Sequence, residues 1–214
     1  AIQHDGISDY ILQQIQKKYS NLEINKKDIF YYVYGLLHSN EYRNAFEADL
    51  KKELPRIPVP ETNQNFSSIS KAGYKLAELH LNYESIQPLN SVSIEFSWDK
   101  PDNNWDLYKV SKMKFGKNKN KADKSIIIFN EYLRIVKIPE KAYEYVVNGR
   151  SAIEWIMESY QIKIDKKSGI VNDPNEWCRE NNNPKYILDL LLSIINMSVQ
   201  TVDIVNSLPK LNLE

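Results

Sequence analysis

The sequence predicts an α+β protein, because the spacing of its apolar residues changes from helical to alternating at about Pro88. Before this point, apolar side chains recur every three or four residues, as on one face of a helix. Just after it, residues 91–98 alternate between apolar and polar side chains, as in a half-buried strand. We therefore expect a helical lobe over residues 1–88 and an antiparallel sheet with covering helices over residues 89–214.

The N-terminal lobe is expected to contain four helices, at residues 8–19, 26–39, 40–54 and 65–84. Ser8 or Asp9 caps the first helix, and the second and third are joined so tightly that they should form a hairpin. Three prolines between residues 55 and 60 exclude both helix and central strand, which predicts an extended strap. Gly73, inside the last helix, is expected to mark close packing against another helix.

The C-terminal part is expected to contain four strands, at residues 91–98, 106–116, 124–130 and 132–139. The polar residues 116–124 should form a loop between the second and third strands. A core helix is expected within residues 141–161, with Trp155 buried in it. The last helix, within residues 182–209, has an apolar stripe so broad that it predicts near-complete burial.

Composition excludes several classes of protein. The 28 basic and 28 acidic residues cancel, so only a local cluster of charge could indicate a nucleic-acid partner. The single cysteine, Cys178, excludes an internal disulfide and fits a reducing compartment. No run approaches the roughly 18 apolar residues of a membrane span, and no signal peptide is visible, so a cytoplasmic protein without a membrane partner is expected. The start at Ala1 without methionine is expected of a fragment of a longer protein.

The sequence contains no recognisable set of catalytic or metal-binding residues. The histidines are isolated from one another, at His4, His38 and His80. We expect His80 to be a hydrogen-bonded packing residue, and Cys178 has no histidine nearby to activate it. Asp165 and Glu176 have the outer spacing of a calcium loop, but the inner positions lack oxygen ligands and turn formation explains the segment better. We expect no catalytic residue, no metal and no cofactor in this chain.

A lysine-rich segment is the one strong electrostatic feature. Between Leu107 and Ser125 there are seven lysines and one aspartate, with Tyr108 and Phe115 interleaved. A solvated hairpin loop would explain the segment, but its lysines could also bind phosphates while asparagine amides meet base edges. The candidate DNA-binding residues here are Lys112, Lys114, Lys117, Asn118, Lys119, Asn120, Lys121 and Lys124. Secondary candidates flank the core helix or follow it, at Arg150, Lys163, Lys166 and Lys167.

Several long motifs resemble one protein family over residues 28–209. They include YYVYGLLHSNEYR, ELPRIP, LAELHLNYE, KMKFGK, YEYVVNGRSAIEWIMESYQ, SGIVNDPN and NNPKYILDLLL through TVDIVNSLP. These motifs are similar to the C-terminal specificity region of type ISP restriction-modification enzymes, which are single chains with nuclease, helicase-like ATPase, adenine N6-methyltransferase, coupler and target-recognition domains. The phosphate loop and the NPPY-like tetrad of that family have no counterpart here, as expected for its last domain.

The resemblance implies a non-catalytic target-recognition domain over the whole chain. Such a domain would bind double-stranded DNA, read a short asymmetric sequence and present it to the methyltransferase, with the methyltransferase and coupler domains as its partners in the parent chain. An alternative is an intramolecular docking module with little DNA affinity, and the aromatic helix around Tyr31, Tyr32 and Tyr34 could then contact the coupler or simply form core. A third alternative, an enzyme of another type, requires a pocket with converging titratable groups.

Overall fold

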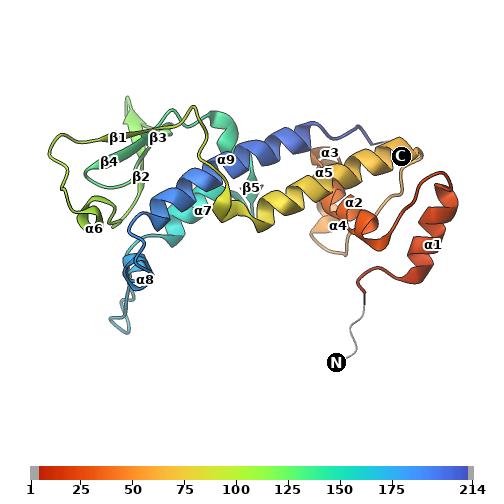
Figure 1. Ribbon diagram of the computed structural model, residues 1–214, viewed down its shortest axis with the longest axis horizontal. Coiled ribbons are helices and arrows are strands. Elements are labelled where there is room, and N and C mark those ends of the chain that lie inside the picture. Colours follow the sequence, from red (N-terminus) through yellow and green to blue (C-terminus); the bar gives the residue numbers. More distant parts are fainter. Residues whose placement is uncertain (1–4, 212–214) are drawn as a thin grey trace. The chain divides into compact units, whose positions relative to one another are not determined.

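The computed structural model describes residues 5–211 and divides the chain into two compact units. We call residues up to Leu81, together with those from Asp203 onward, the helical unit, and residues 82–202 the sheet unit. Helices and an antiparallel four-stranded sheet confirm the α+β class (Figure 1). The end of the last helix and the residues after it group with the helical unit, whereas the sequence-based division places them with the sheet.

The helical unit contains α1 (Asp9–Lys18), α2 (Lys26–His38), α3 (Asn40–Ala45), α4 (Glu47–Leu50) and α5 (Asn63–Leu81). Ser8 caps α1 as predicted, since its side chain accepts a hydrogen bond from the Ile11 amide. The single helix predicted over residues 40–54 is wrong. Phe46 leaves the helical conformation between α3 and α4, and its ring packs against Tyr42 with centroids 5.0 Å apart.

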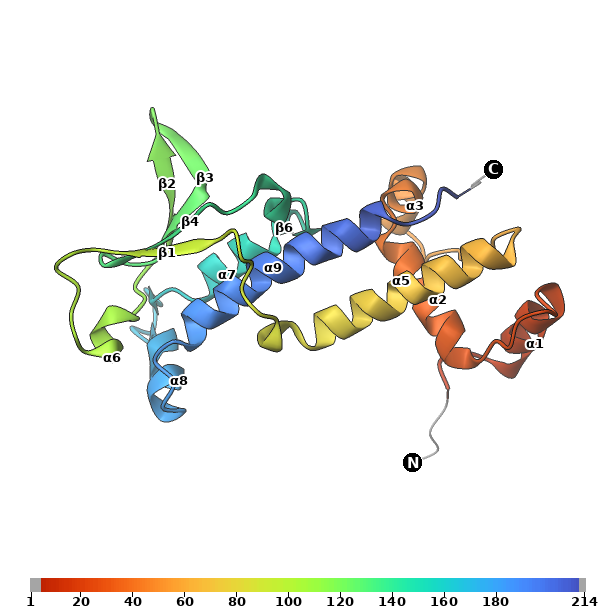
Figure 2. The ribbon, with the colours of Figure 1, turned by 45° about the horizontal axis from the view of Figure 1, so that its top comes forward.

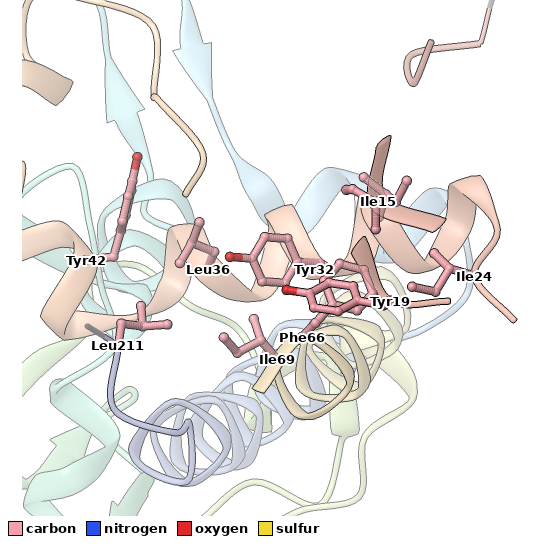
Figure 3. Packing of buried hydrophobic residues seen from close by; sticks show 10 residues of the cluster. Ile15, Tyr19, Ile24, Tyr32, Leu36, Tyr42, Phe66, Ile69 and Leu211 are labelled. Carbon is pink, nitrogen blue, oxygen red and sulfur yellow. The ribbon is translucent and has the colours of Figure 1, made fainter. Parts of the chain in front are cut away.

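Three buried tyrosines hold the proline-rich strap against the core of the helical unit (Figure 3). The Tyr32 hydroxyl donates to the Pro58 carbonyl at 2.5 Å and Tyr42 donates to the Arg56 carbonyl at 2.7 Å, while Tyr19 donates to the Pro60 carbonyl. Alternate carbonyls of the strap therefore face inward, as in an extended chain. The Tyr32 ring also stacks on Phe66, with centroids 4.9 Å apart.

Helices α2 and α5 approach each other closely at two glycines. A Cβ atom added to Gly73 would overlap the Tyr31 carbonyl oxygen and lie 2.8 Å from the Gly35 nitrogen. A Cβ atom added to Gly35 would lie 2.5 Å from the Ile69 carbonyl oxygen. The close packing predicted at Gly73 is thus confirmed, and its cause is backbone contact across the helix pair.

The four-stranded sheet has the order β1-β4-β3-β2, and all neighbours are antiparallel. Its strands are β1 (Ser93–Phe96), β2 (Lys114–Asn118), β3 (Lys121–Ile128) and β4 (Leu133–Val136). Ile94, Ile135 and Ile127 are paired in register across three strands and so share one face. Ile127 and Ile135 are fully buried, whereas Ile94 on the edge strand is 36% exposed.

Short elements connect and extend the sheet. These are the 3-10 helices η1 (Tyr83–Ser85) and η2 (Glu140–Tyr143), helices α6 (Asn104–Leu107), α7 (Ala152–Ser159) and α8 (Pro174–Glu180), and hairpin strands β5 (Val146–Val147), β6 (Arg150–Ser151), β7 (Lys163–Ile164) and β8 (Val171–Asn172). Helix α8 was not predicted, although its sequence carries a start signal. Asp173 caps it and Pro174 occupies its first turn.

The strand predicted over residues 106–116 is largely wrong. Side-chain amides bind the backbone that a neighbouring strand would have paired. The Asn175 side chain accepts from the Val110 amide at 2.9 Å and donates to its carbonyl at 2.7 Å. Asn130 donates to the Leu107 and Lys109 carbonyls. These bonds satisfy the segment without a ladder, so β2 begins only at Lys114.

The last helix, α9 (Tyr186–Asn206), is the predicted buried core helix. Ile187, Leu191 and Ile195 are at most 1% exposed. The helix is long and apolar enough on average to span a membrane, but 67% of that window is buried inside the protein, which is typical of a core helix. The other core prediction was wrong, because Trp155 on α7 is 37% exposed. Its indole nitrogen donates to the Val147 carbonyl at 2.7 Å instead of packing inward.

Candidate nucleic-acid interface

The lysine-rich segment forms a β-hairpin rather than the predicted polar loop. Strands β2 and β3 continue until Asn118 pairs with Lys121, which leaves only Lys119 and Asn120 in the turn. Both turn residues have positive φ, 45° and 66°, as a type I′ turn requires. This turn matches the twist of the strands, so the ladder extends to the tip. Figure 2 shows the hairpin projecting beyond β1 and β4.

An irregularity at the base of the hairpin separates its tip from the core of the sheet. Phe115 pairs with Ile127, but the next residue, Gly116, pairs with Asp123. The extra residues on β3 are accommodated beside Gly116, where a Cβ atom would lie 2.9 Å from the Ile126 Cβ atom. Such bulges bend a strand locally and re-aim the side chains beyond them.

Lys124 makes several contacts at this base. Its ammonium pairs with Glu154 at 2.9 Å and lies 5.1 Å from the ring centroid of Tyr143. The Tyr143 hydroxyl in turn donates to the Lys124 carbonyl at 2.7 Å. Burial opposes ionisation of Glu154, but hydrogen bonds from Lys124 and Ser151 outweigh it and hold the pKa of this carboxyl below its ordinary value. We therefore assign Lys124 a structural role.

The tip carries the solvent-facing candidates. Lys117, Lys119 and Lys121 are exposed, and none of them has an ion-pair partner within the part of the chain that the structure describes. Asn118 and Asn120 are exposed between them. Cationic side chains and amide groups therefore alternate along the last residues of the hairpin, on a backbone held by the ladder.

One side of the hairpin borders a concavity of about 870 Å³, whose opposite wall is formed by residues of η2 and the segment around it. Three lysines line it, Lys119, Lys121 and Lys124. Three acidic residues also line it, Asp123, Glu140 and Glu144. The concavity is therefore balanced in charge and is not a basic channel. Phosphate contacts are better suited to the tip and to the side of the hairpin that carries Lys117.

The β7–β8 hairpin carries three of the secondary candidates, and the segment before it is hydrogen-bonded to the segment that precedes β2. The Ile162 amide donates to the Ser111 carbonyl at 2.9 Å, which places Lys112 beside Lys163 at the start of β7. Lys166 and Lys167 lie in the turn between β7 and β8. All four lysines are exposed. Lys112 lies outside β2, although the strand predicted over residues 106–116 included it.

Arg150 is separate from both hairpin tips. Its guanidinium pairs with Glu158 and lies 5.4 Å from the ring centroid of Trp155. The indole nitrogen of Trp155 donates to the Val147 carbonyl, so the ring lies against the β5–β6 hairpin. Arg150 thus fastens this small hairpin to α7, and the structure supports a structural role for it.

The residues excluded as catalytic have structural partners. The Tyr34 hydroxyl is 2.8 Å from His80 Nδ1, which confirms the packing role predicted for His80. Burial raises the pKa of the Cys178 thiol, the opposite of what a nucleophile needs. Asp165 accepts hydrogen bonds from Lys167 and Ser168, as the turn interpretation predicts. Residues 5–211 contain no group of three or more His, Cys, Asp or Glu side chains that could hold a metal ion.

Comparison with known families agrees with the motifs. The model of the type ISP C-terminal specificity domain matches residues 1–190. The chain belongs to this family. A search of curated proteins found no match.

The specificity domain is also similar to parts of three solved structures. A nuclease-deletion mutant of the type ISP restriction-modification enzyme LlaGI, in complex with a DNA substrate mimic, is 47% identical with a TM-score of 0.76, over 89% of this chain and 17% of that one. The ATP-dependent type ISP enzyme LlaBIII bound to DNA is 40% identical with a TM-score of 0.81, over 99% and 12%. A DrdV–DNA complex is 27% identical with a TM-score of 0.78, over 98% and 20%. The chain thus spans at most a fifth of the length of these proteins.

Sequence reasoning missed two exposed features of the specificity domain. Trp98, just after the edge strand β1, is 96% exposed, and nearby Phe96 is 43% exposed beneath the Lys100 ammonium at 5.7 Å. Arg134 is exposed on β4, paired in register with Glu95. The alternating pattern of residues 91–98 assigned Phe96 to the buried side. The sequence WDKPD, residues 98–102, could have indicated this exposure, because its polar residues cannot bury Phe96 or Trp98.

Proposed function

We propose that this chain recognises a specific sequence in double-stranded DNA, as the C-terminal specificity domain of a type ISP restriction-modification enzyme. The family match over residues 1–190 carries this proposal. The relatives LlaGI, LlaBIII and DrdV were solved with DNA or a DNA mimic, which supports it. In the parent enzyme the domain would present its site to an adenine N6-methyltransferase domain, in contact with the coupler and in the cytoplasm. The domain itself supplies no catalytic group.

The β2–β3 hairpin is the part of the domain that we propose to contact DNA. The major groove of B-DNA is about 12 Å wide and admits a two-stranded β-ribbon. A ribbon that enters the groove brings its edge lysines close to phosphates and its amides close to base edges. Lys117, Lys119 and Lys121 suit the first role, and Asn118 and Asn120 suit the second, since asparagine can bond adenine in a bidentate way.

The phosphate role is tested by replacing Lys114, Lys117, Lys119 and Lys121 with alanine in the parent enzyme. Each lost phosphate contact should flatten the slope of log affinity against log salt by up to about 0.9, and affinity for all duplexes should fall together. A control variant with the same charge change replaces four exposed lysines of the helical unit, Lys17, Lys27, Lys71 and Lys75. If the hairpin variant keeps wild-type affinity and salt slope, the lysines do not contact phosphates and the hairpin is only a solvated surface feature.

The base-reading role is tested at the two asparagines separately. Asn118 lies in a strand, so Asn118→Ala removes the amide without strain. Asn120 has φ of 66°, so Asn120→Gly is the better change, because glycine keeps the turn while deleting the amide. A variant that removes a base contact should lose about 1–3 kcal/mol of discrimination at one position and keep its salt slope. Unchanged discrimination in both variants would exclude base reading by these amides.

The balanced charge of the concavity favours one alternative. The chain could be a docking module that holds the methyltransferase and coupler but contributes little DNA affinity. That function predicts that the fourfold lysine variant leaves duplex binding by the parent enzyme unchanged. It also predicts that the isolated 214-residue chain does not shift any duplex, specific or random, even at low salt where phosphate contacts are strongest.

A further inference from the structure

A row of six rings covers the side of the α2–α5 pair opposite the core. We call it the aromatic stripe, and its members in order are Tyr74, Tyr31, Phe30, Tyr34, His38 and His80. Neighbouring centroids along this order are separated by 5.1, 5.4, 6.3, 4.7 and 5.4 Å. Tyr32, between two stripe residues in sequence, points to the core instead and is 1% exposed.

Two rings of the stripe, Phe30 and Tyr74, are exposed, the other four are half-buried, and the whole stripe is uncharged, which is typical of a protein contact. Phe30 and Tyr74 are 53% and 48% exposed, so about half of each side chain is not covered by the domain itself. Burial lowers the pKa of His80 to about 4, and burial also lowers the pKa of His38, so both rings are neutral at pH 7. Aromatic residues are enriched in the cores of protein interfaces, whereas DNA affinity depends on cations.

The polypeptide enters the domain beside this stripe. The Lys26 ammonium pairs with Asp5 and with Asp9, each at 2.7 Å, and so ties the N-terminal segment to the first turn of α2. Phe30 lies one helical turn beyond Lys26, on the same face. In a parent enzyme five to eight times longer, as the 12–20% coverage of the relatives implies, the preceding domain is connected through this point.

We propose that the aromatic stripe is the docking surface for the domain that precedes this chain in the parent enzyme. The proposal rests on the proposed function, because it requires the chain to be the last domain of a longer protein. Docking between two domains of one chain is intramolecular, so a small stripe can hold a contact that would be weak between separate molecules. Docking here would fix the helical unit relative to the rest of the enzyme.

Hydroxyl-radical footprinting of side chains tests the proposal in the intact protein. Reaction rates of Phe30 and Tyr74 are compared between the isolated chain and the parent enzyme, both without DNA. We expect the rates to fall by at least about threefold in the parent enzyme, as half-exposed rings become interface core. Equal rates in both proteins would overturn the proposal. If Phe30 and Tyr74 are protected only after duplex is added, the stripe contacts DNA and the proposal is wrong. If they are protected in the isolated chain, and more so at higher concentration, the stripe contacts a second copy and the proposal is also wrong.

A matched pair of variants separates docking from folding and from DNA recognition. Phe30→Ser with Tyr74→Ser should return Tyr31 in the parent enzyme to the rate of the isolated chain, whereas Tyr10→Ser, at a 67% exposed ring on α1, should not. Thermal unfolding of the isolated chain checks that both variants fold. Duplex binding by the wild-type enzyme is measured separately. Stripe protection without duplex binding would contradict only the DNA role, and duplex binding without stripe protection would contradict only the docking role.

Discussion

Gly73 is a residue whose substitution should have a large effect although no side chain is lost. Gly73→Ala would place a Cβ atom against the Tyr31 carbonyl oxygen, so α2 and α5 must separate. Overpacking of this kind costs about 1–3 kcal/mol or more. The free energy of unfolding, measured by urea denaturation, should fall by that amount. Gly6→Ala is the control, because nothing lies within 4 Å of an added Cβ atom there, and equal stability of the two variants would contradict the close approach.

Trp155 and Phe129 test how exposure determines the cost of truncating a large aromatic residue. Phe129 is fully buried, so Phe129→Ala should cost about 3–5 kcal/mol. Trp155 is 37% exposed and contributes mainly its bond to the Val147 carbonyl and its contact with Arg150, so Trp155→Ala should cost clearly less. Chemical denaturation of both variants measures the difference. A larger loss at Trp155 would show that the ring is core after all.

At the scale of elements, the tyrosines that hold the proline-rich strap make the helical unit sensitive to alkaline pH. Burial, with smaller contributions from neighbouring tyrosines, raises the pKa of Tyr32, and burial also raises the pKa of Tyr19 and Tyr42. Above about pH 10 these groups ionise in the unfolded chain but stay protonated in the folded one. The unfolded state then binds fewer protons, so stability is full below that pH and decreases as pH rises above it.

Replacing the central tyrosine tests this account. Tyr32→Phe removes the donor to the Pro58 carbonyl and should cost about 1–3 kcal/mol at neutral pH if that carbonyl is left unpaired. The same variant should lose less stability than the wild type between pH 8 and pH 11, because one shifted group is gone. Urea denaturation at both pH values gives the four free energies, with Tyr10→Phe as the matched exposed control. A wild-type pH slope in Tyr32→Phe would contradict the role of this hydroxyl.

At the scale of the whole molecule, the chain should have no chemistry of its own. The sequence lacks a phosphate-binding loop and a methyltransferase tetrad, so the isolated chain is expected neither to bind S-adenosylmethionine nor to hydrolyse ATP. Calorimetric titration with the cofactor and a phosphate-release assay check both statements. Tight cofactor binding to this fragment would overturn the assignment as a recognition module.

The sequence by itself determined the fold class and much of the scaffold. Helical spacing located α2, α5 and α9, because a helix that buries one face must repeat apolar residues at its own period. The three prolines predicted the strap, since each lacks an amide donor, and Gly73 indicated close packing, since it has no Cβ atom. The turn at Asp165 was also predictable, because its carboxylate accepts a hydrogen bond from the nearby Ser168 amide. All these features have a signal in residues that are close together in the sequence.

Only the tertiary structure decided what depends on distant partners. Residues 106–113 have the pattern of a strand, but amides from Asn130 and Asn175 bind their backbone and prevent one. Lys124 belongs to the lysine-rich segment in sequence, yet its ammonium pairs with Glu154, thirty residues away. Trp155 is a large aromatic residue in a helix expected to be core, but its indole nitrogen donates to the Val147 carbonyl. The physical reason is the same in each case: hydrogen bonds and ion pairs form with whatever group the fold brings near, and spacing along the chain carries no information about that group.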